Sequence, residues 1–431
     1  MQKLRILRRA GILLWRIKCE LMYLAAFLWR RLLFRTTFIA ITGSVGKTTA
    51  KECLATILAS RARTAKTLRN QNGIDGLPRT MLRVRPWHRF AVLEVATSGH
   101  GQMRKWARMV RPHVAVVLAV ARAHMKSFRT LENVAREKSM LPAALSPGGI
   151  ALLNGDDPLV AGMADGRYRV VWFGSSPEFD LHADELTSGW PERLSFRVHA
   201  CGGSMRVQTR LIGTHWKNSV LAALAASQAC GVPMADAVRA IASVEPVPGR
   251  LQPVTLPSGA VLIRDDYNGS TDTLAKALPV LAEAKAARKF LVISDVTDSS
   301  QRPRDRLAKF GREAARIANF ALFIGPRAEH GVKGALSGGM PPGHALSFAT
   351  FEPAVEFLAS ELRQNDLVLV RGRTCDHLAR VYFKLLGTVK CRKLDCEKTL
   401  LCDYCSELGF KPCQKPGLAG LPAGDSSGGA R

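Results

Sequence analysis

The stretch from Phe38 to Thr49, FIAITGSVGKTT, constrains this chain more than any other part of the sequence. Apolar and β-branched residues lead into a loop that contains Gly43 and Gly46, and a helical pattern begins at Lys47. A strand, a glycine loop and a helix start in this order present backbone N–H groups and a lysine to phosphate. The stretch is therefore predicted to bind a nucleotide phosphate, through a shortened form of the usual phosphate-binding loop.

The residue types of this loop suit the chemistry of phosphate. Gly43 and Gly46 permit a tight turn and close backbone approach, Lys47 neutralises phosphate charge, and the Thr48 hydroxyl suits Mg²⁺. The predicted phosphate-binding residues are Gly43, Ser44, Val45, Gly46, Lys47, Thr48 and Thr49.

Length and charge bound what the chain does. Its 431 residues suffice for two or three domains, and 47% apolar residues are typical of a globular protein. The net charge is +27 (62 minus 35), which favours an anionic partner such as a nucleotide or an anionic lipid surface. No aromatic-interleaved basic ribbon or RNA-binding signature is present, so nucleic acid is not an expected partner. No cleavable signal is evident, which favours the cytoplasm and argues against a disulfide framework for the ten cysteines.

Residues 1–36 mix basic side chains with Leu, Ile, Trp and Phe throughout. The longest apolar run, Leu21 to Trp29, is far shorter than the roughly 20 residues that span a bilayer. A basic amphipathic helix of this kind suits the surface of an anionic membrane, which would place the protein peripherally at the inner face. The alternatives are a helix packed on its own domain and a helix packed on a partner protein.

After the loop, polar residues follow successive predicted strands. Glu94 lies at or near the end of FAVLE, His124 follows VAVVLAV, and Asn154 ends IALLN, while Lys138 lies in the helical pattern ENVAREKSML. Alternating strands and helices predict a doubly wound parallel sheet. Taken singly, each residue has an ordinary structural explanation. Together, after a phosphate-binding loop, they favour a metal–phosphate site.

Eight motifs in this order resemble those of the Mur ligases, over roughly residues 38–385. They are TGSVGKTT, NQNGIDGLPRT, LEVATSGHGQM, VARAHMKSFRTLENVAREKSML, LLNGDDP, GTHWKNSVLAALAA, PVPGR and DDYNGSTDT. The resemblance implies an α/β fold, with a central P-loop ATPase domain built on a parallel sheet and a smaller Rossmann-like C-terminal domain. The expected divisions are a helical segment at 1–36, the ATP-binding domain at 37–245, the C-terminal domain at 246–388, and a cysteine-containing tail at 389–431 whose end is disordered.

The resemblance also assigns roles around ATP and two Mg²⁺ ions. Thr48 and Glu94 would hold one Mg²⁺, and His124 would hold the second. Lys138 matches the lysine that the family carbamylates into an anionic metal ligand, although Ser-Met follows it here in place of Gly-Glu. The remaining positions that match nucleotide contacts of the family are His215, Asn218, Arg250, Asp265, Tyr267 and Asn268.

Two departures concern the substrates. Family members place a UDP-sugar-binding domain ahead of the loop, where this sequence has residues 1–37, so the carboxylate substrate is expected to be held in another way. RGRT, with Arg371 and Arg373, replaces the family KGSR in a region that helps to hold the amine. The implied activity is an ATP-dependent, ADP-forming amide ligase that joins a carboxylate to an amino acid or peptide amine through an acyl phosphate.

A cell-wall (peptidoglycan) precursor is the expected carboxylate. The alternatives are a ligase for a non-wall substrate and a degenerate nucleotide-binding scaffold at the membrane. In the tail, five cysteines that include the pair Cys402 and Cys405 suggest zinc, with reduced structural cysteines and redox chemistry as alternatives.

Overall fold

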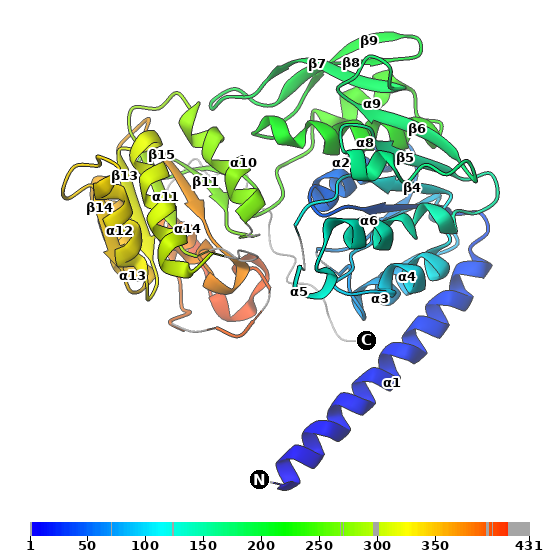
Figure 1. Ribbon diagram of the computed structural model, residues 1–431, viewed down its shortest axis with the longest axis horizontal. Coiled ribbons are helices and arrows are strands. Elements are labelled where there is room, and N and C mark those ends of the chain that lie inside the picture. The colour runs from blue at the N-terminus through cyan, green and yellow to red at the C-terminus, as the bar shows by residue number, and fades with distance from the viewer. Residues whose placement is uncertain are drawn as a thin grey trace. The chain divides into compact units, whose positions relative to one another are not determined.

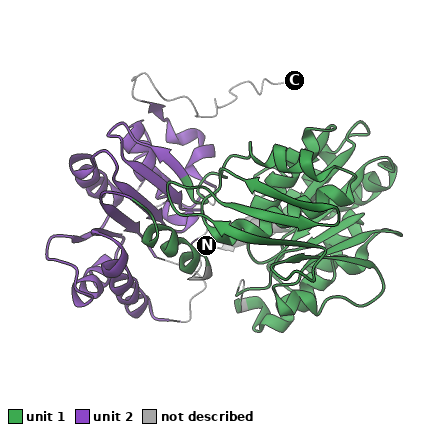
Figure 2. Cartoon of the chain, turned by 90° about the horizontal axis from the view of Figure 1, so that it is seen from above, with its two compact units in different colours: residues 1–252, 270–285, 296–300 green, residues 253–269, 286–295, 301–431 purple. Residues whose placement is uncertain are grey.

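The computed structural model describes residues 2–412, except 70, 123–124, 268, 270, 296–300, 394–395 and 399. The chain forms two compact units, each with its own sheet and core (Figure 2). Unit 1 comprises residues 1–252, 270–285 and 296–300, and unit 2 comprises 253–269, 286–295 and 301–431.

Within the described residues of unit 1, nine strands form one sheet in the order β2-β3-β1-β4-β5-β6-β7-β8-β9 (Figure 1). The strands are β1 (Thr37–Thr42), β2 (Thr64–Lys66), β3 (Phe90–Glu94), β4 (Val114–Val117), β5 (Ile150–Asn154), β6 (Arg169–Gly174), β7 (Leu181–Thr187), β8 (Ser195–Ala200) and β9 (Gly203–Gln208). Neighbours from β2 to β7 pair in parallel, and β8 and β9 continue the sheet antiparallel. The predicted parallel α/β sheet is confirmed.

One strand differs from the prediction. The alternation of apolar and polar residues over 170–212 predicts short antiparallel strands, among them VVWFG, but VVWFG forms β6, which pairs in parallel with β5. Residues 155–168 join the two strands, and a connection of a dozen or more residues is long enough for the crossover that parallel pairing requires.

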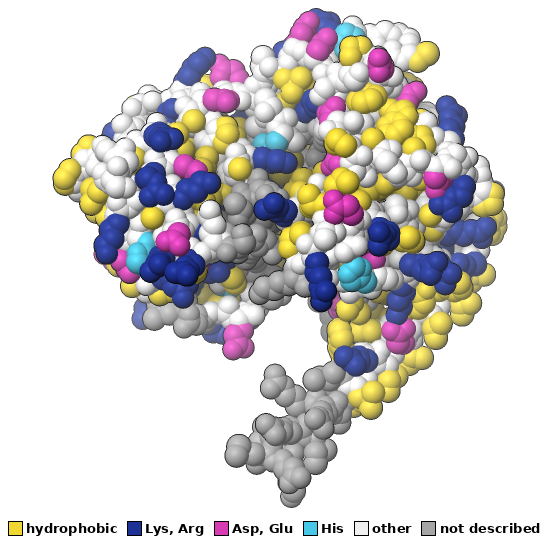
Figure 3. Space-filling view, viewed as in Figure 1, with side chains coloured by type: hydrophobic (Ala, Val, Ile, Leu, Met, Phe, Trp, Pro, Cys, Tyr) yellow, Lys and Arg dark blue, Asp and Glu magenta, His cyan; other side chains and the backbone are white. Residues whose placement is uncertain are grey.

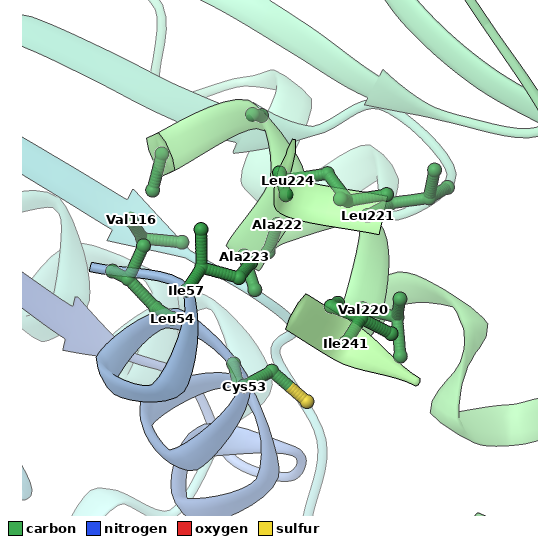
Figure 4. Packing of buried hydrophobic residues seen from close by; sticks show 14 of the residues in the cluster. Cys53, Leu54, Ile57, Val116, Val220, Leu221, Ala222, Ala223, Leu224 and Ile241 are labelled. Atoms are coloured by element: carbon green, nitrogen blue, oxygen red, sulfur yellow. The ribbon is translucent and has the colours of Figure 1, made fainter. Parts of the chain in front are cut away.

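Helices cover both faces of this sheet because its strands are apolar on both sides. Ile39 and Ile41 of β1 face a core with α2 (Lys47–Ala59), α8 (Lys217–Ala229) and α9 (Met234–Ile241). Figure 4 shows Leu54 and Ile57 of α2 close to Val116 of β4 and to residues of α8. Phe38 and Ala40 face the other core, with α3 (Gly76–Arg83) and α4 (Gln102–Val110). The other helices of unit 1 are α5 (Met125–Phe128), α6 (Leu131–Ser139), α7 (Pro158–Ala161) and α10 (Thr271–Ala282).

Residues 2–32 form the single helix α1 (Gln2–Leu32), which meets the body of unit 1 at its C-terminal end (Figure 1). Ala26 is fully buried there, and the Trp29 indole donates to the Val84 carbonyl at 2.8 Å. No helix in the described part of the chain has the length and apolar character to cross a membrane.

Unit 2 contains a six-stranded sheet among its described residues, in the order β10-β11-β15-β12-β13-β14. The strands are β10 (Gln252–Thr255), β11 (Val261–Asp265), β12 (Lys289–Ile293), β13 (Phe320–Ile324), β14 (Ala345–Phe348) and β15 (Leu367–Arg371). The sequence predicts four strands here, and the structure confirms all of them as β11, β12, β13 and β15: the predicted runs are AVLIRDDYNGST, RKFLVISDV, FALFIG and NDLVLVRGRT. The pairs β11–β15, β15–β12, β12–β13 and β13–β14 are parallel. The helices are α11 (Pro303–Ile317), α12 (Ala328–Ser337), α13 (Phe351–Glu361) and α14 (Ala379–Leu386).

Just ahead of the tail, β16 (Gly387–Thr388) pairs with β17 (Lys411–Pro412), which lies within it. Cys391, Cys396, Cys402 and Cys405 line a small cavity beside His377. Across the described residues, however, no group of three or more His, Cys, Asp or Glu side chains is arranged to hold a metal ion. The zinc hypothesis gains no support.

Candidate active site

The phosphate-binding loop lies at the carboxyl end of β1 and leads directly into α2. Gly46 precedes the helix at φ +83°, and a Cβ there would lie 2.6 Å from the Ser219 hydroxyl of α8. Only glycine fits this position. The Lys47 ammonium donates to the Gly43 carbonyl at 2.6 Å, which holds the lysine side chain against the phosphate-binding loop.

Glu94 ends β3, next to β1, and pairs in register with Ile41. The Asn72 amide donates to its Oε1 at 2.8 Å. Its Oε2 is buried and has no hydrogen-bond partner among the described residues; the Lys51 ammonium lies 3.9 Å away. A buried carboxylate oxygen that accepts no hydrogen bond, and whose nearest ion-pair contact is as long as 3.9 Å, suits a metal cation, because a poorly solvated buried charge is costly.

Lys138 is 5% exposed, on α6. Burial and the nearby positive charge of Lys47 lower the pKa of Lys138 to about 7, against the opposing effect of Glu137. Glu137 itself accepts from the backbone N–H groups of Gly101 and Met103, which ties α6 to the start of α4. A lysine amine near neutrality is unprotonated half of the time at pH 7 and is then nucleophilic.

Three more predicted residues lie in unit 1. Arg250 donates to the Thr48 hydroxyl at 3.2 Å, which brings the predicted γ-phosphate arginine to the loop. The Asn218 amide, at the start of α8, donates to Asp156 at 3.1 Å and to Asn154 at 3.3 Å, beyond the end of β5. His215 precedes α8 and packs on Trp216 with ring centres 4.5 Å apart. The phosphate-binding loop, the carboxyl ends of the strands and the start of α8 thus meet at one edge of the sheet.

Sequence reasoning missed several residues that support this edge. Lys51 is fully buried and donates to the Thr67 carbonyl at 2.9 Å, under the Glu94 carboxylate. Ser219 donates to the Gly46 carbonyl at 3.3 Å. The polar, glycine-rich stretch that contains Asn72 predicts a loop, but nothing in its residue types points to the contact with Glu94. A second lysine four residues after the loop lysine, one helical turn along α2, was the available signal for Lys51.

Unit 2 holds the remaining predicted residues. Asp265 ends β11 and forms a buried ion pair with Arg371. The Tyr267 carbonyl accepts from the Thr374 hydroxyl. Arg373 forms an ion pair with Asp376 at 2.6 Å. His124 and Asn268 lie outside the described residues.

A cavity of about 130 Å³ opens at the carboxyl end of β12 and β13. Arg327 and Arg373 line it together with Asp295 and Asp376, so charges of both signs face one space. Such a lining suits a ligand that carries both an ammonium and a carboxylate.

Comparison with known proteins decides the family. Residues 41–227 match the Mur ligase middle domain, and residues 249–374 match the Mur ligase glutamate ligase domain. The UDP-N-acetylmuramoyl-tripeptide–D-alanyl-D-alanine ligase of Mycobacterium tuberculosis is 30% identical over 376 residues, covering 82% of this chain and 74% of the relative. This chain belongs to the Mur ligase family. The Escherichia coli ligase of the same name is 33% identical over 276 residues, which are 63% of this chain and 60% of that protein.

Solved Mur ligases share the fold. A MurF structure from Acinetobacter baumannii superposes with a TM-score of 0.78 and 26% identity, covering 84% of this chain and 79% of that one. MurF of Thermotoga maritima in complex with ADP gives a TM-score of 0.72 at 23% identity, covering 84% and 82%. The predicted family resemblance is confirmed, and the protein is an ATP-dependent, ADP-forming amide ligase of the MurF type.

Proposed function

We propose that this Mur ligase joins the terminal carboxylate of a UDP-muramoyl-tripeptide, a peptidoglycan precursor, to the amine of D-alanyl-D-alanine. The substrate names are those of its relatives. The observation that carries the proposal is the grouping at the loop of three side chains, Lys47, Glu94 and Lys138. They are a phosphate lysine, a buried carboxylate with an oxygen that accepts no hydrogen bond from the described residues, and a lysine of lowered pKa. This set suits phosphoryl transfer to a carboxylate.

Mg²⁺ fits the site on chemical grounds. The Thr48 hydroxyl and the open Oε2 of Glu94 are oxygen ligands of the type that Mg²⁺ prefers. From the family resemblance, a second ion would be held by His124, which lies outside the described residues, and by Lys138 if its amine has taken up CO₂ as a carbamate. When bound, the ions neutralise charge on the β- and γ-phosphates.

The chain's own cations complete the reaction site. Burial, and to a smaller extent the positive charge of Arg250, lowers the pKa of Lys47, so the two cations are neighbours. Both would hold the γ-phosphate. The substrate carboxylate attacks the γ-phosphorus, the bond to the bridging oxygen of ADP breaks, and an acyl phosphate forms. An unprotonated amine then attacks the acyl carbon. The tetrahedral intermediate expels phosphate, and the proton of the amine leaves to solvent.

We assign the amine component to the 130 Å³ cavity of unit 2. Arg327 and Arg373 suit the carboxylate of a dipeptide. Asp295, which also pairs with Arg306 at 2.5 Å, suits its ammonium. The replacement of the family KGSR by RGRT keeps two positive charges here. Nucleotide contacts of Asp265, Tyr267 and Asn268 stay predictions from the family.

We further propose that residues 1–36 attach the enzyme to the inner, anionic surface of the cytoplasmic membrane. Exposed apolar residues recur along α1 at intervals of three and four, so they lie on one face. They are Leu14, Ile17, Leu21, Leu24, Leu28 and Leu32, which are 47–67% exposed. The outer edge of α1 is accordingly apolar (Figure 3).

The test of the reaction is ADP release in the presence of UDP-muramoyl-tripeptide and D-alanyl-D-alanine, with mass spectrometry of the product. Wild type should give the pentapeptide precursor, and Lys47→Ala should give none. Turnover with another carboxylate and no response to UDP-muramoyl peptides would refute the proposed substrate.

A further inference from the structure

Unit 1 has a strongly basic surface groove outside the ATP site and next to helix α1. Two adjoining grooves of about 630 and 580 Å³ share Arg111, Ala143 and Arg167 in their linings. The arginines that line the two grooves, here called the arginine groove, are Arg104, Arg108, Arg111, Arg167 and Arg169. All five are exposed. Asp165 is the acid in this lining, and it pairs with Arg167.

The other four arginines lack an ion-pair partner within the described residues. The positive charges are also crowded. Arg111, together with Arg31, contributes to lowering the pKa of the buried Arg30, although burial is the largest cause. Unneutralised and mutually repelling cations around an open groove favour an anion, because each bound negative charge relieves the repulsion.

The arginine groove lies at the opposite edge of the sheet from the phosphate-binding loop. Arg111 precedes β4 and Arg169 begins β6, so both mark the amino ends of parallel strands whose carboxyl ends carry the active site. Strands of five residues separate the two edges by about 17 Å. The groove therefore does not belong to the ATP site.

The same edge receives the base of α1. Arg30 donates to the carbonyls of Val110 and Arg111 at 2.7 and 2.8 Å, and Arg31 donates to the Arg108 carbonyl at 3.1 Å. The last carbonyls of α4 are thus capped by arginines of α1. These hydrogen bonds place the C-terminal end of α1, which carries the exposed apolar face, next to the arginine groove. Lys and Arg side chains gather where α1 meets the body of unit 1 (Figure 3).

We infer that the arginine groove binds the phosphate headgroups of anionic lipids, so that α1 inserts its apolar face while the groove holds the membrane surface at its base. This inference rests on the proposed membrane attachment of residues 1–36. Arginine suits phosphate because its planar fork donates two parallel hydrogen bonds. Lipid is the source that fits, since a soluble anion would not explain an exposed apolar face beside the groove.

The test is co-sedimentation of the full chain with phosphatidylcholine vesicles, with and without phosphatidylglycerol. The groove variant carries Arg104→Gln, Arg108→Gln and Arg169→Gln. Its control carries Arg312→Gln, Arg316→Gln and Lys333→Gln, exposed residues of unit 2, so both have the same net charge (27 minus 3 gives +24). With roughly a five-fold effect for each of the three lost cations, the groove variant should bind anionic vesicles about a hundred-fold more weakly, and the control within a few-fold of wild type.

A third variant separates the inference from the attachment itself. Leu21→Gln with Leu28→Gln removes apolar surface from α1 at exposed positions and should release the protein from all vesicles. If this variant fails to bind while the groove variant binds like its control, the membrane attachment stands and the headgroup site is refuted. If the wild-type protein does not bind anionic vesicles, the membrane attachment and the headgroup site are both refuted. A wild-type dimer in light scattering that the α1 variant dissociates would assign the apolar face to a second copy and overturn the inference.

Discussion

The lowered pKa of Lys138 gives the sharpest prediction about the active site, because it governs both stability and modification. An ordinary lysine titrates near 10.5, and burial together with Lys47 brings Lys138 to about 7. The difference of about 3.5 units corresponds to about 5 kcal/mol that the folded protein loses when this lysine is protonated. At pH 7 about half of the amines are neutral, about a thousand-fold more than for an exposed lysine.

The direction of the pH dependence of stability follows from the protons that the folded and unfolded chains bind. Between pH 7 and 10.5 the unfolded chain holds a proton on Lys138 that the folded chain does not, so this group makes stability rise with pH in that window. Below pH 7 the folded protein bears the full free-energy cost of a protonated, buried Lys138. Lys138→Met should therefore stabilise the protein by a few kcal/mol at pH 6, and the gain should shrink towards pH 10. Denaturant unfolding of the wild-type and Lys138→Met proteins between pH 6 and pH 10 measures this gain in stability.

The same neutral amine should take up CO₂. In ¹³C-bicarbonate, wild type should show a carbamate signal by ¹³C NMR that grows as the pH rises through about 7. Lys138→Arg, which keeps the charge and lacks a reactive amine, should show no signal and no ligase activity. A Lys138→Met protein whose stability gain is the same at pH 6 and pH 10, or a fully active Lys138→Arg protein, would refute the reasoning.

Further predictions concern the loop and the amine cavity. Gly46→Ala should abolish ATP binding in calorimetry and cost roughly 1–3 kcal/mol of stability, because the new Cβ would lie 2.6 Å from the Ser219 hydroxyl and the backbone has a positive φ. Adding Ser219→Gly should recover only the stability lost to that clash, and not the part lost to the positive φ. Glu94→Gln should leave the fold intact, since the Asn72 contact can persist, and should weaken Mg²⁺-dependent ATP binding by ten-fold or more. Arg373→Met should raise KM for the amine while KM for ATP stays near wild type; an ATP-specific change would contradict the assignment of the cavity.

Much of the ATP site could be predicted from the sequence because its chemistry is local. The order of strand, glycine loop and lysine is contiguous, and Glu94 follows an unmistakable buried strand. The partners of these residues could not be predicted in the same way. Asn72, Lys51 and Ser219 reach the site only through packing between elements far apart in the chain, and their residue types are ordinary for a loop and for helices.

The fold shows the same division between local and non-local information. Strands β11, β12, β13 and β15 are apolar runs that any pattern analysis finds, whereas the parallel pairing of β6 depends on the crossover before it. The arginine groove had no sequence signal at all. Its arginines are scattered from 104 to 169 and meet because the amino ends of parallel strands share one edge.

Transfer of ¹⁸O tests the central claim, an acyl phosphate intermediate, most directly. The carboxylate of the acceptor peptide is labelled with ¹⁸O and turned over with ATP and the dipeptide amine. The account predicts ADP and inorganic phosphate that carries one ¹⁸O, because the attacking carboxylate oxygen leaves with the phosphate. Unlabelled phosphate during product formation, or label found in AMP, would contradict it.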